Sequence, residues 1–226
     1  ISDVLIHDIA SVESSLTGII VSECSGTSIE KTIIRGIAAK SLTGIFVSQS
    51  PDSSLNDCFI HDCTTTETCI GLYIHKDRGS SVFSADIHDL LVSGSNAEAI
   101  GFLCDETIGT GLSHCIARSI QAEEANSSAY GFKIINSDRL LQRNCTASLI
   151  ETTLNGSDAY GILWSNVSLS ALIESIIDDT RAIGQGFGML ATSVSESEIN
   201  GNQFLNTAGG TLRRGLRVVN GTRNLF

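Results

Sequence analysis

Residues 101–104 read Gly-Phe-Leu-Cys, and this segment decides the fold because similar segments recur along the whole sequence. Each copy begins with a glycine and continues with β-prone residues, and successive glycines are 26, 27, 30, 30, 30, 27 and 27 residues apart. The eight copies are GIIV at Gly18, GIFV at Gly44, GLYI at Gly71, GFLC at Gly101, GFKI at Gly131, GILW at Gly161, GMLA at Gly188 and GLRV at Gly215. A period of this length predicts a solenoid, in which each repeat buries its apolar face against its two neighbours.

The composition fits one elongated domain over residues 1–226. The chain has a single proline, its 21 glycines are spread through the repeats, and its mean hydropathy of +0.17 suits a rod with a continuous buried core. Ile1 falls inside a repeat and no cap is visible after Asn220, so we expect the chain to be a segment of a longer polypeptide.

The charge and the apolar pattern exclude two classes of partner. The net charge is −11 and the pI is near 4.7, so the phosphates of a nucleic acid would be repelled. No apolar run approaches the roughly 18 residues that a membrane span requires. We therefore expect neither a nucleic-acid partner nor a membrane span.

A second pattern follows each glycine segment after a polar corner. It reads SIEKTIIRGI from Ser28, SLNDCFIHDC from Ser54, SVFSADIHDL from Ser81 and GLSHCIARSI from Gly111. Strict alternation predicts short strands whose apolar residues point inward. Small or polar residues recur at one further position, which we interpret as a bend: Asp8, Gly36, Asp62, Asp89 and Ser119. Each repeat is therefore expected to hold three short strands joined by three bends.

The segment G-I-x-V, followed by a polar corner and x-I-x-x-N/D, resembles the parallel β-helix repeat of the pectin-lyase-like superfamily. The resemblance implies an all-β, right-handed parallel β-helix of about eight coils of 26–30 residues. That superfamily includes polysaccharide lyases, glycosidases, phage tailspikes and adhesins. Its catalytic motifs, such as the paired aspartates of polygalacturonases, do not occur in this chain, so the resemblance supports the fold and not an activity.

One outward-facing position of the repeat is occupied by large apolar residues in six of eight coils. We predict that these residues form a binding surface: Ile20, Phe46, Tyr73, Leu103, Leu163 and Leu190. Lys133 and Arg217 occupy the same position in the other two coils. A stripe of this size usually marks an interface. It could be covered by a segment of the same chain or by another chain or domain, or it could line an active-site groove.

Two further patterns carry polar chemistry. A basic column reads His7, Arg35, His61, His88 and Arg118, and we expect its next members at Glu174 and Asn200. We interpret it as solvated residues paired with neighbouring aspartates, because metal sites need three or four convergent ligands. A corner with His75 and Lys76 is expected to bring together the carboxylates of Asp77, Asp105 and Glu106, as polysaccharide cleavage would require.

The seven cysteines show no metal or redox spacing and are expected to be free, mostly buried thiols, with Cys63 and Cys69 as the one possible bridge. We expect no cofactor and no metal. The sequence favours a non-catalytic structural or interaction module, such as a surface, adhesin or virion component, that associates with protein through the apolar stripe. The alternative is a polysaccharide lyase or glycoside hydrolase that uses Asp77, Asp105 and Glu106, with a polysaccharide as partner.

Overall fold

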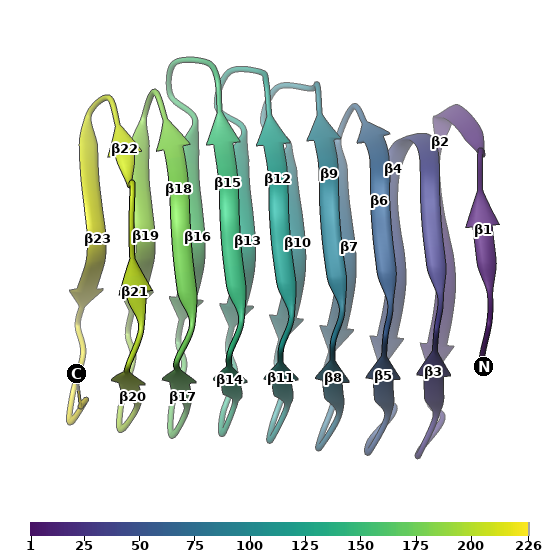
Figure 1. Cartoon of the computed structure of the whole chain (residues 1–226), viewed down its shortest axis with the longest axis horizontal. Helices are drawn as coiled ribbons and strands as arrows, with labels where there is room; N and C mark the ends of the chain where they lie inside the picture. Colours follow the sequence, from purple (N-terminus) through teal and green to yellow (C-terminus); the bar gives the residue numbers. More distant parts are fainter. Residues whose placement is uncertain (226) are drawn as a thin grey trace.

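The computed structural model describes residues 1–225, which form a right-handed coil of short strands. In Figure 1 the chain advances from the N terminus at the right to the C terminus at the left, while near strands run upward and distant strands run downward. Residues 1–225 contain no helix, and therefore none that is long and apolar enough to cross a membrane. The predicted right-handed parallel β-helix of about eight coils is confirmed.

Each coil contributes strands to three faces, which we name the front, back and short faces after Figure 1. The front face holds β1 (Leu5–His7), β6 (Phe59–Thr65), β9 (Asp86–Val92), β12 (Ile116–Ala122), β15 (Thr146–Thr152), β18 (Ile176–Ala182), β21 (Gln203–Phe204) and β22 (Ala208–Gly209). The back face holds β7 (Thr68–His75), β10 (Glu98–Asp105), β13 (Ser128–Ile135), β16 (Asp158–Ser165), β19 (Gln185–Thr192) and β23 (Leu212–Val219).

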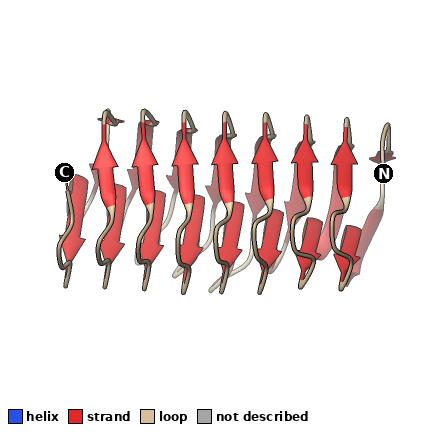
Figure 2. Ribbon diagram, turned by 90° about the horizontal axis from the view of Figure 1, so that it is seen from below, coloured by secondary structure: helices blue, strands red, loops and turns tan. Residues whose placement is uncertain are grey.

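The short face, which Figure 2 shows toward the viewer, is built from three-residue strands. These are β3 (Ser28–Glu30), β5 (Ser54–Asn56), β8 (Ser81–Phe83), β11 (Gly111–Ser113), β14 (Leu141–Arg143), β17 (Ala171–Ile173) and β20 (Glu198–Asn200). Two long strands, β2 (Ala10–Ser22) and β4 (Ile33–Ser48), run from the front face onto the back face. All strand pairs are parallel, so equivalent residues of successive coils lie in rows about 4.8 Å apart.

The glycine of each repeat is needed because it faces the neighbouring coil at close range. A Cβ atom on Gly101 would lie 2.7 Å from the carbonyl oxygen of Gly131 and 2.9 Å from the Cβ atom of Ala117. The same approach to the next glycine carbonyl, at 2.5 to 2.8 Å, occurs at Gly18, Gly44, Gly71, Gly131, Gly161 and Gly188. Any side chain at this position would push two coils apart, which explains why the segment that defines the repeat begins with glycine.

The predicted bend on the front face is confirmed by its backbone. Asp62 and Asp89 have φ angles of 54° and 53°, and Gly36 has 62°, all in the left-handed region. Leu149 and Asp179 continue the row in later coils with φ angles of 53° and 54°. Aspartate and glycine tolerate this conformation better than most residues, so their recurrence at this position has a conformational cause.

The core is the set of inward rows that the glycine segment predicts. Phe102 and Phe132 stack in it with ring centroids 4.8 Å apart, and Trp164 is fully buried. Gln142 occupies an inward position of the short face between Leu112 and Leu172, and neither atom of its buried amide has a hydrogen-bond partner. The core therefore contains one polar side chain at a place where its neighbours are leucines.

All seven cysteines are free, six of them buried and Cys24 exposed. Cys63 and Cys69 are not bridged. At the corner between the short and front faces, the thiols of Cys58, Cys115 and Cys145 donate to backbone carbonyls two residues earlier. These cysteines thus satisfy corner carbonyls as well as filling space.

Candidate functional site

The strand register places the predicted apolar stripe in a single row on the outside of the back face. Phe46 pairs with Tyr73, Tyr73 with Leu103, and Leu163 with Leu190. Ile20 lies at one end beside Phe46, and Lys133 interrupts the row between Leu103 and Leu163. The structure therefore brings together all six residues that the sequence singled out.

Members of the stripe differ strongly in exposure. Ile20 is 62% exposed, whereas Leu103 is only 7% exposed. Leu103 is buried by a second outward row that precedes the glycine, whose members include Ile70, Ile100 and Tyr130. Side chains of its own and adjacent coils therefore cover Leu103, and its burial needs no second chain.

The second outward row was missed by the sequence analysis. Its members flank the glycine on the opposite side from the stripe: Ile70, Ile100, Tyr130, Tyr160 and Phe187. The rings of Tyr130, Tyr160 and Phe187 stack with centroids 5.0 and 5.5 Å apart. An apolar residue directly before each of these glycines was the signal that could have revealed the row.

Charged groups border the stacked rings. The Lys133 ammonium lies 4.5 Å from the centre of the Tyr130 ring and 2.6 Å from the Glu98 carboxylate. The Tyr160 hydroxyl donates to the Asp158 carboxylate at 3.1 Å. Burial, together with these carboxylates, raises the pKa of the Tyr130 and Tyr160 phenols well above their usual value, so both remain neutral hydrogen-bond donors.

A polar cluster lies at the end of the same face. The Nδ1 atom of His75 is 3.3 Å from the Tyr73 hydroxyl and 3.5 Å from the Asp105 carboxylate. Asn136 donates to the same carboxylate at 3.2 Å. Burial and the nearby carboxylates of Asp105 and Glu106 raise the pKa of Tyr73. The arrangement joins a phenol, an imidazole and a carboxylate in one half-buried group.

The predicted corner of three carboxylates, Asp77, Asp105 and Glu106, does not form, because Asp77 points away from the other two. Asp77 is 1% exposed and points into the coil, where its carboxylate accepts hydrogen bonds from the Ser50 amide at 2.8 Å and from the Ser80 hydroxyl. Lys76 precedes it with a φ of 50°, and a left-handed residue interrupts the inward and outward alternation. Asp105 and Glu106 therefore remain on the surface without Asp77.

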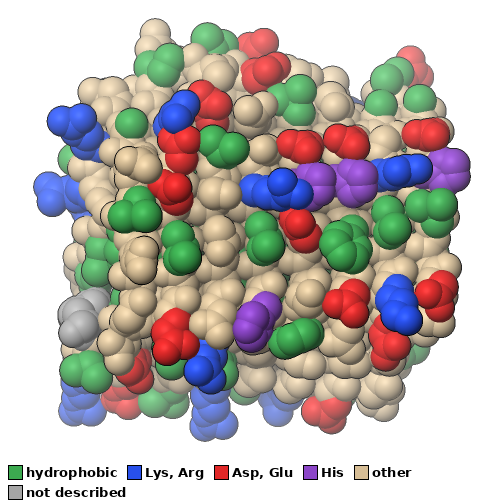
Figure 3. All heavy atoms as spheres, in the orientation of Figure 1, with side chains coloured by type: hydrophobic (Ala, Val, Ile, Leu, Met, Phe, Trp, Pro, Cys, Tyr) green, Lys and Arg blue, Asp and Glu red, His purple; other side chains and the backbone are tan. Residues whose placement is uncertain are grey.

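The basic column lies on the front face, where Figure 3 shows it as a line of blue and purple side chains beside a line of red ones. We call His7, Arg35, His61, His88 and Arg118 the basic row. The expected later members were wrong: the strand register continues the row to Ser148 and Asp178, not to Glu174 and Asn200. Glu174 follows the short-face strand β17, and Asn200 belongs to β20.

Within the basic row, the rings of His61 and His88 are stacked with centroids 4.8 Å apart. Each histidine holds the aspartate that follows it, at 2.8 Å for Asp62 and 2.7 Å for Asp89. Burial alone would raise the pKa of Asp89, but the hydrogen bond from His88 brings it below its usual value. The expected pairing of this column with aspartates is confirmed.

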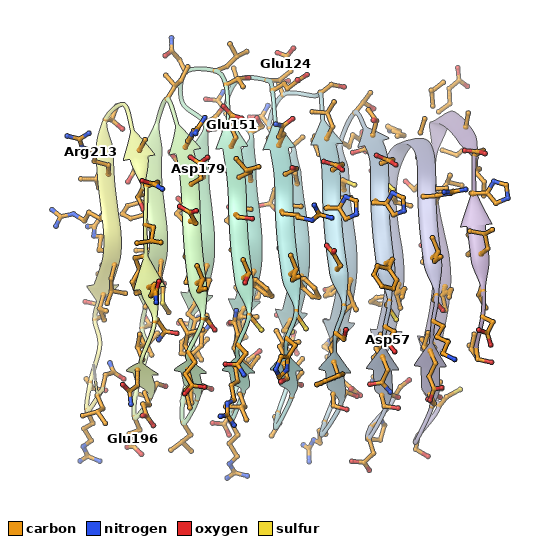
Figure 4. The ribbon with its side chains drawn as sticks, in the orientation of Figure 1. Asp57, Glu124, Glu151, Asp179, Glu196 and Arg213 are labelled. Carbon is orange, nitrogen blue, oxygen red and sulfur yellow. The ribbon has the colours of Figure 1, made fainter. Side chains whose placement is uncertain are left out.

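Cavities and groups of side chains that could bind a metal ion are two further kinds of feature that could hold a ligand. A shallow depression of about 350 Å³ beside the basic row is lined by Asp62, Thr64, Asp89, Leu91 and Gln121, among others. Within residues 1–225, no group of three or more histidine, cysteine or acidic side chains is placed to hold a metal ion. Figure 4 shows that charged side chains such as Asp57, Glu124 and Glu196 lie scattered over the strands and turns.

Comparison with solved structures finds chains of low similarity. The chain is a parallel β-helix. It is similar to ORF18 of Geobacillus virus E2 (11% identity, TM-score 0.30), covering 97% of this chain and 52% of that chain. It is also similar to the A-module of the Azotobacter vinelandii mannuronan C-5 epimerase AlgE6 (9% identity, TM-score 0.25; 98% and 80% covered).

A third similar structure is the Streptococcus pneumoniae surface protein and adhesin PfbA (7% identity, TM-score 0.25; 95% and 91% covered). The β-helix thus spans about half the length of the viral chain. No protein-family model and no curated protein matches it. At these identities and TM-scores the similarities carry no conclusion about the function of this chain.

Proposed function

We propose that this β-helix is a non-catalytic interaction module that associates with a second protein surface through the apolar stripe of its back face. The observation that carries the proposal is the row of large apolar side chains running along the outside of a regular, rigid sheet. Ile20 is largely exposed and Phe46, Tyr73, Leu163 and Leu190 are half-buried. Apart from side chains of the back face itself, which bury Leu103, no strand of residues 1–225 lies over the stripe.

The energetics favour contact at the half-exposed positions. Complete burial of an exposed Ile or Leu side chain is worth roughly 1.5 to 3 kcal/mol relative to water. Phe46 and Tyr73 add an aromatic pair with centroids 5.1 Å apart, and aromatic residues are enriched at protein interfaces. Leu103 contributes little, because folding of the chain already buries it.

The test is self-association of the chain, measured by size-exclusion chromatography with light scattering and by analytical ultracentrifugation. The double variant Phe46→Asp/Leu190→Asp changes two half-buried outward residues, so it should become monomeric while its far-UV circular dichroism stays that of the parent. Thr64→Asp, at an outward position of the front face, is the matched control and should associate like the parent. Equal association of the parent and the double variant would refute the proposal.

A second candidate is a polysaccharide lyase or hydrolase, and the specific observation for it is the contact of Asp105 with His75 beside Tyr73. Glu106 lies next to Asp105 and forms a loose ion pair with Lys76 at 3.9 Å. An activity of this kind predicts cleavage of a uronic-acid polymer by the parent. Asp105→Asn and Glu106→Gln should then each abolish cleavage, while Phe46→Asp/Leu190→Asp should reduce it mildly.

A further inference from the structure

The basic row runs straight across five consecutive coils of an otherwise acidic chain. Strand pairing joins His7 to Arg35, Arg35 to His61, His61 to His88, and His88 to Arg118. Successive members are therefore about 4.8 Å apart along one line. Three of the five histidines of the chain lie in this row. It occupies the front face, whereas the apolar stripe lies on the back face.

Each histidine of the row is oriented by the aspartate that follows it. The Nδ1 atom of His7 lies 2.9 Å from the Asp8 carboxylate. His61 and His88 contact Asp62 and Asp89 in the same way. Because a carboxylate accepts the Nδ1 hydrogen, Nε2 of a neutral ring carries only a lone pair and cannot donate. Protonation places a hydrogen on Nε2, so only the charged ring can donate to an anion.

The charge of this surface depends on those three rings. Arg35 on β4 and Arg118 on β12 flank the histidines, and Arg118 pairs with Asp86 of β9 at 3.4 Å. The remaining titratable group of β4, Lys40, is paired with Glu67. The carboxylates that contact members of the row are Asp8, Asp62, Asp86 and Asp89. These four outnumber the two guanidinium groups when the rings are neutral, whereas five cations face four carboxylates when the rings are charged.

We propose that the basic row is an acid-dependent binding site for a linear polyanion whose charged groups are sulfates or phosphates. A line of cations fits an extended chain of charges, and strong-acid sulfate and phosphate groups stay ionised at the pH that charges imidazoles. The rest of the protein repels such a ligand: its 25 carboxylates outnumber its 14 Lys and Arg residues and 5 His residues even when every histidine is charged. The net charge of the chain therefore opposes nonspecific binding of such a ligand.

The experiment measures the affinity of the parent chain for dextran sulfate and for inorganic polyphosphate, with uncharged dextran as the blank. Because exposed ion pairs contribute about 0.2 to 1 kcal/mol each, three new imidazolium contacts should tighten binding by about tenfold between pH 7.5 and pH 5.5. The double variant His61→Gln/His88→Gln should lose most of this pH dependence. Arg35→Gln should weaken binding at both pH values.

His114→Gln is the matched control, because His114 is exposed but follows the short-face strand β11 and contacts the Ser113 hydroxyl at 2.9 Å. It should bind like the parent, and circular dichroism should show that every variant keeps the parent fold. Binding of only one polymer would assign the charged group of the ligand as sulfate or phosphate. The proposal is overturned if neither polymer binds at pH 5.5, or if His61→Gln/His88→Gln retains the pH dependence of the parent.

Discussion

Adding a single methyl group at Gly101 should destabilise the β-helix. The new Cβ atom of Gly101→Ala would lie 2.7 Å from the Gly131 carbonyl oxygen and 2.9 Å from the Ala117 Cβ atom. Neither neighbour is the end of a flexible side chain, so the fourth and fifth coils must move apart locally. Overpacking of this kind costs about 1 to 3 kcal/mol. Replacing glycine by alanine also lowers the entropy of the unfolded chain, but this stabilises the folded state by only about 0.4 to 1 kcal/mol.

Gly111→Ala is the matched control for this prediction. Gly111 lies in β11, a Cβ atom there would meet nothing within 4 Å, and its φ angle is not positive. Without a clash, only the effect on the unfolded chain remains, so this variant should be more stable than the parent by about 0.4 to 1 kcal/mol. The two substitutions should therefore change the free energy of unfolding in opposite directions.

Urea unfolding measures this difference through the fluorescence of Trp164, the single tryptophan of the chain, which is fully buried. Hydrogen exchange should also show faster opening of β10 and β13 in Gly101→Ala, because these strands carry the strained contact. If Gly101→Ala were as stable as Gly111→Ala, close approach of the coils could not be the reason for the glycine repeat.

Three further predictions concern buried polar groups. Gln142→Leu should raise the free energy of unfolding by about 1 to 3 kcal/mol in urea titrations, because it removes two unpaired amide atoms from the core; a lower stability would show that the amide has a partner. Thiol titration should find Cys24 alone reactive in the folded chain and seven thiols in denaturant, since burial raises the pKa of Cys104 to about 12 and shields it. The three tyrosine phenols have raised pKa values, so their stabilising contribution is complete below their unfolded pKa near 10 and is lost as the pH rises further. Ultraviolet titration should show them ionising together with unfolding, and ionisation of all three near pH 10 in the folded chain would contradict this.

The period and the inward rows were predictable from the sequence because successive coils of a solenoid stack in register. Equivalent positions of the repeat are therefore neighbours in the structure. Recurring glycine gave the one fixed point from which Phe102 and Cys104 could be placed inward. The later part of the basic row was not predictable in the same way. After Arg118 the row continues with Ser148 and Asp178, which are neither histidine nor arginine. Without a recurring residue type to follow, the sequence pattern placed the later members wrongly at Glu174 and Asn200.

The position of Asp77 shows what simple alternation omits. His75 faces outward, Lys76 is in the left-handed conformation, and Asp77 faces inward. Non-glycine residues adopt this conformation rarely, so a sequence without homologues gives little warning that the alternation is interrupted there. Asp105 lies beside His75 on the outer surface, as predicted. Its predicted partner Asp77 instead points into the interior of the coil.

The two large faces differ because their strands are interrupted in opposite ways. On the front face a left-handed residue follows an outward one, so His61 and Asp62 both project outward and contact each other. On the back face the glycine precedes an inward residue, so the flanking outward side chains, Ile100 and Leu103, converge and bury each other. The same repeat thus yields a charged ridge on one side and a self-packed apolar surface on the other. The proposed polyanion site therefore lies on the front face, and the proposed association surface is limited to the exposed and half-exposed members of the apolar stripe.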